Sequence, residues 1–108
     1  MTDVDVQEAR RAALAGEVLL LDVREDDEWA VGRAPGAVHL PMSQLHQDSC
    51  SRDLPVYVLC RVGSRSAAVT HALAQLGYSV SNVAGGMLAW AASGLPVVQD
   101  GDAPGRVV

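Results

Sequence analysis

The residues best suited to covalent chemistry stand together in one segment, Cys60-Arg61-Val62-Gly63-Ser64-Arg65-Ser66. The cysteine ends an apolar run typical of a buried strand, and the serines open a run with helical periodicity. In an open α/β sheet, ligands bind beyond the carboxyl ends of the strands. We therefore predict that the thiol of Cys60 lies in such a crevice and acts as a nucleophile.

Three features of this segment favour a thiolate over a thiol. A helix that begins near Ser64 directs its unpaired N–H groups and the positive end of its dipole toward the loop. Gly63 allows a turn in which successive N–H groups face inward as an anion nest. Arg61 and Arg65 add two positive charges, and settings of this kind lower the pKa of a cysteine. A structural cysteine at a strand end is the alternative, which these neighbours disfavour.

Alternating strand and helix patterns surround this segment. Continuous apolar runs predict buried parallel strands, and two weaker β-rich stretches add to them. Helical segments lie between the strands, and the strongest has Gly77 after it and Ser64 or Ser66 as a possible cap. The predicted strands are 18–23, 37–40, 56–60 and 78–83, and the predicted helices are 7–15, 26–31, 64–76 and 86–93.

This order predicts an α/β fold, with an open, mainly parallel sheet of about five strands and helices on both faces. The 108 residues fit one domain, which we place at residues 1–98, followed by a loose tail at 99–108 that contains Gly and Pro. The chain has no Phe, so we expect an aliphatic core anchored by Trp29 and Trp90.

The composition limits the partners that the chain can bind. Its net charge is −5 and all eight basic residues are Arg, which argues against a general nucleic-acid binder or a protein that binds anionic membranes. Any small anion would be bound by arginine forks and backbone amides, because Lys is absent.

No secretory signal or membrane-length apolar run is visible, so we expect a cytoplasmic protein whose Cys50 and Cys60 are reduced thiols. The two cysteines lack metal-ligand spacing to any histidine. His39, His46 and His71 likewise form no triad-like arrangement. We therefore predict no metal and no cofactor.

The loop at Cys60 resembles the active-site loop of the rhodanese family, which begins Cys-Arg, has Gly fourth and closes Arg-Ser. Other blocks resemble the family in the same order, from about residue 4 to residue 98, whereas Arg33-Ala34 and Ala84 depart from its common pattern. The matching blocks are Leu21-Asp22-Val23-Arg24-Glu25 with Glu28-Trp29, Pro35-Gly36-Ala37 with Pro41, Gly85-Gly86-Met87 with Ala89-Trp90, and Gly94-Leu95-Pro96-Val97.

The resemblance implies a sulfurtransferase with a two-step reaction. The Cys60 thiolate attacks the outer sulfur of a small anionic donor such as thiosulfate, sulfite leaves, and Cys60 carries a persulfide. Cyanide, a thiol or a sulfur-acceptor protein then removes that sulfur, and no general base is required. The residues expected to bind the donor are Arg61, Val62, Gly63, Ser64, Arg65 and Ser66.

Two other functions remain open at this point. Cysteine-dependent phosphatases and arsenate reductases share the fold but need one more residue between Cys and Arg than the four present between Cys60 and Arg65. A non-catalytic rhodanese-like binding module is the other, although such domains usually lack the cysteine. Cys50 as a resolving thiol is not expected.

Asp22, Arg24 and Glu25 follow a predicted strand and so belong to the same edge of the sheet as Cys60. They are expected either to order the loop by pairing with Arg65 or Arg61, or to form a structural network of their own.

Overall fold

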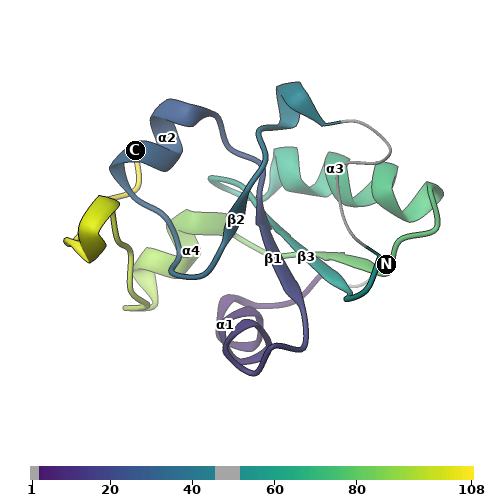
Figure 1. Cartoon of the computed structure of the whole chain (residues 1–108), viewed down its shortest axis with the longest axis horizontal. Helices are drawn as coiled ribbons and strands as arrows, with labels where there is room; N and C mark the ends of the chain where they lie inside the picture. Colours follow the sequence, from purple (N-terminus) through teal and green to yellow (C-terminus); the bar gives the residue numbers. More distant parts are fainter. Residues whose placement is uncertain (1–2, 46–51) are drawn as a thin grey trace.

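The fold is built around one open sheet, seen in a computed structural model that describes residues 3–45 and 52–108 (Figure 1). The sheet has strand order β2-β1-β3-β4, and every neighbouring pair is parallel. Its strands are β1 (Leu19–Asp22), β2 (Val38–His39), β3 (Val56–Leu59) and β4 (Val80–Asn82).

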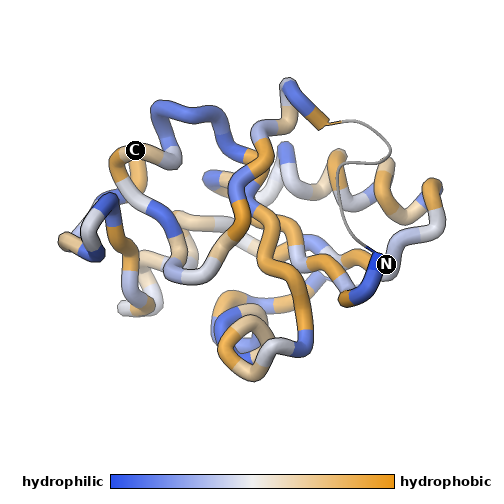
Figure 2. Tube along the Cα trace, viewed as in Figure 1, coloured by the Kyte–Doolittle hydropathy of each residue, from blue (hydrophilic) through white to orange (hydrophobic). Residues whose placement is uncertain are grey.

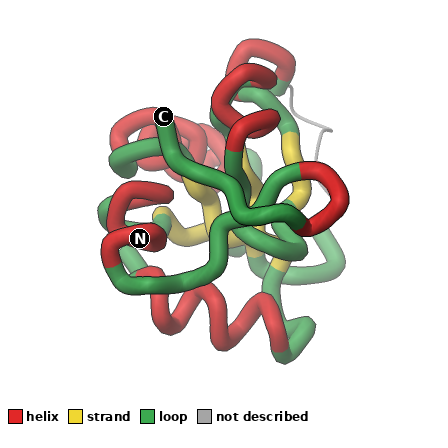
Figure 3. Tube along the Cα trace, turned by 90° about the vertical axis from the view of Figure 1, so that its left-hand side faces the viewer, coloured by secondary structure: helices red, strands yellow, loops and turns green. Residues whose placement is uncertain are grey.

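Helices cover both faces of this sheet, so that the strands lie between helical layers (Figure 3). The α-helices are α1 (Val6–Leu14), α2 (Asp26–Val31), α3 (Ser64–Gln75) and α4 (Gly86–Ala92), and the short 3₁₀ helices are η1 (Met42–Gln44) and η2 (Asp100–Asp102). Parallel strands need such crossover connections, and their burial on both faces explains the continuous apolar runs of β1 and β3. Figure 2 shows β1 as hydrophobic up to its last residue, Asp22, and the first turn of α2 as hydrophilic.

Two buried clusters fill the space between sheet and helices. One joins α1 and α4 to the sheet through residues such as Val6, Leu20 and Trp90. The other joins α3 to the opposite face through Val58, Cys60, Val69, Leu73 and neighbouring residues. Cys60 therefore belongs to the core as well as to the end of its strand.

The predicted α/β class, the parallel sheet and the helices on both faces are confirmed. The strand count differs slightly, because the described residues form four strands rather than about five. A single parallel bridge between Val4 and Val83 extends the β4 side of the sheet. The prediction of Trp29 as a core anchor is wrong: α2 buries none of its residues, and the Trp29 ring stacks on His39 with centroids 4.5 Å apart.

The C-terminal segment is packed rather than loose, which corrects the prediction for residues 99–108. Val98 bridges to Pro104, and the Arg106 N–H donates to the Val31 carbonyl at 2.9 Å. Gly32 makes this approach possible, because a Cβ there would lie 2.0 Å from the Arg106 carbonyl oxygen. The tail therefore lies against the end of α2. The domain boundary at residue 98 itself stays a prediction.

A fully buried ion pair lies at the carboxyl end of β1. The Arg24 guanidinium donates to both carboxylate oxygens of Asp22 at 2.8–3.1 Å, and both side chains are 0% exposed. The same guanidinium donates to the carbonyl oxygens of Gly32 at 2.7 Å and Glu28 at 3.4 Å. Arg24 thus satisfies the end of α2 and fixes that helix to the sheet.

We predict that Arg24→Met lowers the free energy of unfolding by about 3–5 kcal/mol, because it leaves the Asp22 carboxylate buried without its ionic partner. Urea denaturation measures this loss. Arg11→Met is the matched control, since Arg11 pairs with Glu8 and Glu17 on the exposed surface, and its loss should be much smaller. Equal losses in the two variants would contradict the structural role of the buried pair.

Candidate active site

The thiol of Cys60 lies at the carboxyl end of β3, directly before the loop that leads into α3. The residue is 0% exposed. Its Sγ accepts the Gly63 N–H at 3.1 Å and lies 3.2 Å from Ser66 Oγ. The sulfur is therefore held by loop and helix groups on one side and by the core on the other.

The pKa of the Cys60 thiol lies below its ordinary value. Burial by itself raises it, because a thiolate loses hydration when it is removed from water. The Ser66 hydroxyl and the N–H groups of Ser66, Gly63 and Val62 lower it by more in total. Hydrogen bonds from the start of α3 and its loop thus favour the thiolate.

The loop is held in this shape by two glycines. Gly63 has a φ of +105°, in the left-handed region, and it precedes the first residue of α3. Gly86 packs directly beneath the loop, because a Cβ there would lie 2.4 Å from the Cys60 carbonyl oxygen. That carbonyl accepts the Met87 N–H at 2.8 Å. The first turn of α4 thereby anchors the backbone of the cysteine.

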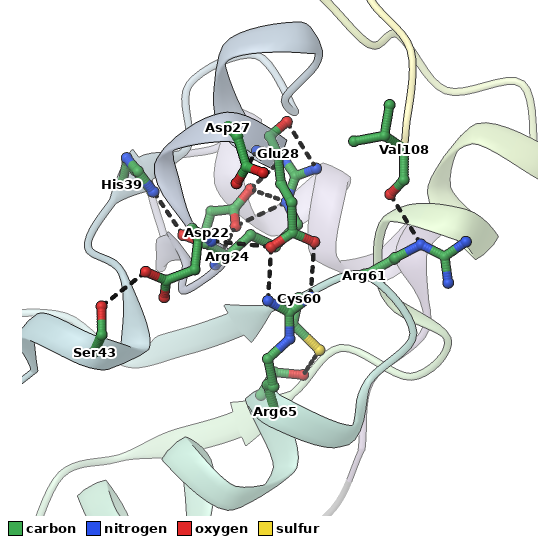
Figure 4. A network of polar contacts seen from close by, with 12 residues as sticks. Asp22, Arg24, Asp27, Glu28, His39, Ser43, Cys60, Arg61, Arg65 and Val108 are labelled. Atoms are coloured by element: carbon green, nitrogen blue, oxygen red, sulfur yellow. Dashed lines mark hydrogen bonds and ion pairs between the residues drawn. The ribbon is translucent and has the colours of Figure 1, made fainter.

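Arg65 forms a two-pronged ion pair with Glu28 of α2 (Figure 4). Its two terminal nitrogens donate to the two Glu28 oxygens at 2.7 and 2.8 Å. The hydrogen bond from Arg65 holds the pKa of Glu28 at about 2. This pair clamps the first turn of α3 to α2. Glu28 belongs to one of the segments that resemble the rhodanese family, but its pairing with Arg65 was not predicted from the sequence.

The side chain of Arg61 turns away from the sulfur. Its side chain is directed toward Val108, whose carbonyl oxygen accepts its Nε–H at 2.9 Å (Figure 4). Of the two arginines expected close to the thiol, Arg65 binds Glu28 while its charge still interacts with that of Cys60, and Arg61 binds the C-terminal segment. Their roles in binding a donor stay predictions. Val62, which stands between Arg61 and Gly63 in the sequence, is 47% exposed at the rim of the loop.

Asp22, Arg24 and Glu25 do not pair with Arg61 or Arg65. Asp22 and Arg24 bind each other, as described above. The Glu25 carboxylate instead accepts from the Ser43 hydroxyl at 2.8 Å, and Glu25 begins α2 in a capping box with Glu28. These residues form a structural network that positions α2, and through α2 the carboxylate that binds Arg65.

Ser66 and Asn82 complete the surroundings of the thiol. The sequence allowed Ser64 or Ser66 as the cap of α3, but the N-cap is Gly63 and no side chain makes a cap hydrogen bond there. The Ser66 hydroxyl donates to Asn82 Oδ1 at 2.5 Å, and Asn82 Nδ2 donates to the Gly63 carbonyl at 3.3 Å. Asn82 was missed because its strand is short and carries no other chemical signal. Its place at the end of a strand parallel to β3 was the available clue.

The remaining candidates lie away from the thiol or outside the described residues. His39 ends β2 and its Nε2 lies 2.7 Å from the Arg24 carbonyl oxygen. His71 lies on α3 beside Gln75. Cys50 and His46 fall outside the described residues.

Within residues 3–45 and 52–108, no group of three or more His, Cys, Asp or Glu side chains is arranged to hold a metal ion. In the same part of the chain, no helix has the length and apolar character needed to cross a membrane.

Comparison with known proteins places this site in context. A family model described as Rhodanese-like domain matches residues 5–93. A protein named sulfurtransferase from Allochromatium vinosum is 40% identical over 93 residues, which cover 83% of this chain and 87% of that protein.

Two solved structures are also similar. A rhodanese-related protein from Thermoplasma volcanium is 30% identical with a TM-score of 0.84, covering 93% of this chain and 100% of that one. A thiosulfate sulfurtransferase from Pseudomonas aeruginosa is 31% identical with a TM-score of 0.81, covering 93% of this chain but 20% of that one.

We predict that the Glu28–Arg65 pair stabilises the domain above pH 4.5 and loses its effect in acid. Because folding lowers the pKa of Glu28 from 4.5 to about 2, its contribution is complete above pH 4.5 and disappears as the pH falls through about 2. The pair is partly exposed, so Glu28→Gln should cost about 1 kcal/mol or less at pH 7. Urea midpoints of both proteins should converge toward pH 2, and a constant difference would contradict this assignment.

Proposed function

The chain belongs to the rhodanese-like domain family, and from that premise we propose that it transfers sulfur by carrying it as a persulfide on Cys60. The observation that supports this most directly is the state of the thiol. Cys60 is buried, yet its pKa is lowered, because Ser66 and the N–H groups of Ser66, Gly63 and Val62 favour its anion over its neutral form. A thiolate held in this way is already a nucleophile and needs no base.

The first step of the proposed reaction loads the cysteine. The Cys60 thiolate attacks the outer sulfur of a sulfane donor such as thiosulfate, and a new S–S bond forms at Sγ. The S–S bond within thiosulfate breaks, and its electron pair leaves with sulfite. The outer sulfur keeps the negative charge that it carries in thiosulfate, and the additional charge leaves on sulfite as SO3²⁻, so charge and atoms balance without a proton transfer.

The second step unloads the cysteine. A nucleophile, either cyanide, a thiolate or a sulfur-acceptor protein, attacks the outer sulfur and breaks its bond to Sγ. The electron pair returns to Sγ and restores the thiolate. The product is thiocyanate or a new persulfide.

The loop residues take different roles in this proposal. The N–H groups of Val62, Gly63 and Ser66 are directed at the sulfur and would stabilise the anion throughout the reaction. Ser64 and Arg65 form the first turn of α3, where the clamp with Glu28 keeps those N–H groups in place. Arg61 is exposed at the rim, so its charge would attract an anionic donor rather than contact the reacting sulfur. The proposed setting is a compartment that keeps thiols reduced, as in the cytoplasm.

A phosphatase or arsenate reductase is less compatible with this loop. Such an enzyme needs its loop arginine to grip a tetrahedral oxyanion, whereas both terminal nitrogens of Arg65 bind Glu28. The spacer between cysteine and arginine is also one residue shorter than that class requires. A non-catalytic binding module would have no need of a thiol with a lowered pKa.

We predict that thiosulfate adds the mass of one sulfur atom to the protein and that Cys60→Ser abolishes this adduct together with thiocyanate formation, because the only proposed carrier is then lost. Intact mass spectrometry and a colorimetric thiocyanate assay give the two readouts. Cys50→Ser is the matched control and should retain both. A sulfur adduct that survives in Cys60→Ser would overturn the assignment.

We further predict that the protein does not hydrolyse para-nitrophenyl phosphate above the rate of its Cys60→Ser variant, because Arg65, the arginine that would have to hold the phosphoryl group in the loop, is bound to Glu28. Release of nitrophenolate at saturating substrate measures this. Turnover that depends on Cys60 would favour the phosphatase function instead.

A further inference from the structure

We propose that Asn82 is a positioning residue that sets the reactivity of Cys60 by competing with its sulfur for the single hydroxyl proton of Ser66. The inference rests on the proposed function in one respect: it takes Cys60 as the reacting thiolate. Asn82 is buried at the end of β4 and touches the loop on two sides.

The orientation of the Asn82 amide is fixed by the Gly63 carbonyl. A carbonyl oxygen can only accept, so the amide nitrogen must face it, at 3.3 Å. The amide oxygen is then directed at Ser66, whose hydroxyl lies 2.5 Å away and donates to it. Turning the amide over would place two acceptor oxygens against each other, so Asn82 is held as an acceptor toward Ser66.

The Ser66 hydroxyl cannot serve both neighbours with its one proton. When Cys60 is a neutral thiol, its S–H can donate to Ser66 Oγ at 3.2 Å while the hydroxyl donates to Asn82. When Cys60 is a thiolate, the strongest arrangement has the hydroxyl donating to Sγ, and Asn82 Oδ1 then loses that donor. Asn82 therefore stabilises the neutral sulfur relative to the thiolate.

This competition would assist the proposed reaction cycle. In the persulfide the negative charge lies on the outer sulfur, and Sγ no longer needs the hydroxyl proton. Ser66 can then donate to Asn82 again. Ser66 and Asn82 thus make the thiolate of Cys60 less stable relative to its persulfide. This difference favours the reaction of the thiolate with a sulfur donor.

The charged groups around Cys60 are the same with or without Asn82. They are Arg65 on α3 with its partner Glu28 on α2, Arg61 in the loop, and the Asp22–Arg24 pair at the end of β1. The segments of β4 and α4 that pack here, residues 80–82 and 86–92, contain no ionisable side chain. A change in the titration of Cys60 on substitution of Asn82 would therefore act through hydrogen bonds.

The test measures the rate of Cys60 alkylation by iodoacetamide against pH, in a Cys50→Ser background so that one thiol reacts. The variants are Asn82→Ala, Asn82→Asp, Ser66→Ala and the double variant Asn82→Ala with Ser66→Ala. Ser81→Ala is the matched control, because Ser81 lies next to Asn82 on β4 with its side chain on the other face of the strand. Cooperative thermal unfolding verifies that each variant is folded.

Asn82→Ala frees the Ser66 proton for the thiolate, so the midpoint of the profile should move to lower pH. Below the midpoint, alkylation should become about two- to tenfold faster, the range that one net hydrogen bond provides. Asn82→Asp keeps an acceptor toward Ser66 and adds a carboxylate that repels the thiolate, so its midpoint should lie at or above that of the parent. Ser66→Ala should raise the midpoint, and in that background Asn82→Ala should produce no further acceleration.

A purely structural role for Asn82 gives a different pattern. Both substitutions remove the bond to Gly63, so simple loosening of the loop would move both midpoints in the same direction. That result, or an acceleration by Asn82→Ala that persists without Ser66, would overturn the proposal. If Asn82→Ala does not fold, Asn82→Leu takes its place, because leucine has a similar size and offers no acceptor to Ser66, and a midpoint at or above that of the parent would refute the proposal.

Alkylation requires no sulfur donor, which separates this test from the test of the proposed function. A protein that takes no sulfur from thiosulfate would contradict sulfur transfer and leave the alkylation profiles interpretable. If the alkylation profiles of the Asn82 variants match that of the parent while sulfur uptake is normal, the competition for the Ser66 proton is refuted and the proposal of sulfur transfer is unaffected.

Discussion

The buried ion pair between Asp22 and Arg24 is the contact on which the arrangement of the site depends. It occupies the carboxyl end of β1, where Asp22 lies in register with Leu59 of β3, the residue before the cysteine. Arg24 uses its remaining donors on the end of α2, so the helix that carries Glu28 has a fixed position. Glu28 in turn clamps Arg65. A pair with no contact to the thiol therefore determines where the first turn of α3, and the N–H groups that face Sγ, are placed.

The thiolate is favoured chiefly by hydrogen bonds. The sequence places two arginines beside Cys60, but neither donates a hydrogen bond to its sulfur: Arg65 binds Glu28, although its charge interacts with that of Cys60, and Arg61 binds the C-terminal segment. An ion pair has a weak field at a distance, so Arg65 contributes chiefly by holding the helix in place. The N–H groups and the Ser66 hydroxyl act at contact distance inside the core, where an unscreened dipole has its greatest effect.

The sequence was sufficient to predict the fold class, the helices on both faces of the sheet, and the bounds of α2 and α3 to within about one residue. Apolar periodicity and a glycine after the end of a helix are local signals, which is why these features could be predicted. It could also indicate that Cys60 ends a strand. It could not show which acid binds Arg65, since Glu25 and Glu28 stand three residues apart and helix geometry decides between them. Asn82 and the packed tail depend on contacts between distant segments, which no local pattern encodes. The strand count was slightly overestimated: the described residues form four strands, and Val4 adds a single bridge at the β4 side.

Binding the sulfur with neutral donors also fits the chemistry of a carrier. A guanidinium in contact with Sγ would stabilise the thiolate strongly and would retain sulfite as a product, and both effects oppose turnover. Fixed N–H dipoles can stabilise a charge on Sγ and then on the outer sulfur without moving, because the two atoms are bonded neighbours. The Ser66 hydroxyl, unlike the backbone N–H groups, can rotate between two acceptors, Cys60 Sγ and Asn82 Oδ1. The site thus combines a rigid set of amides with one adjustable hydroxyl, which suits the alternation between thiolate and persulfide that we propose for Cys60.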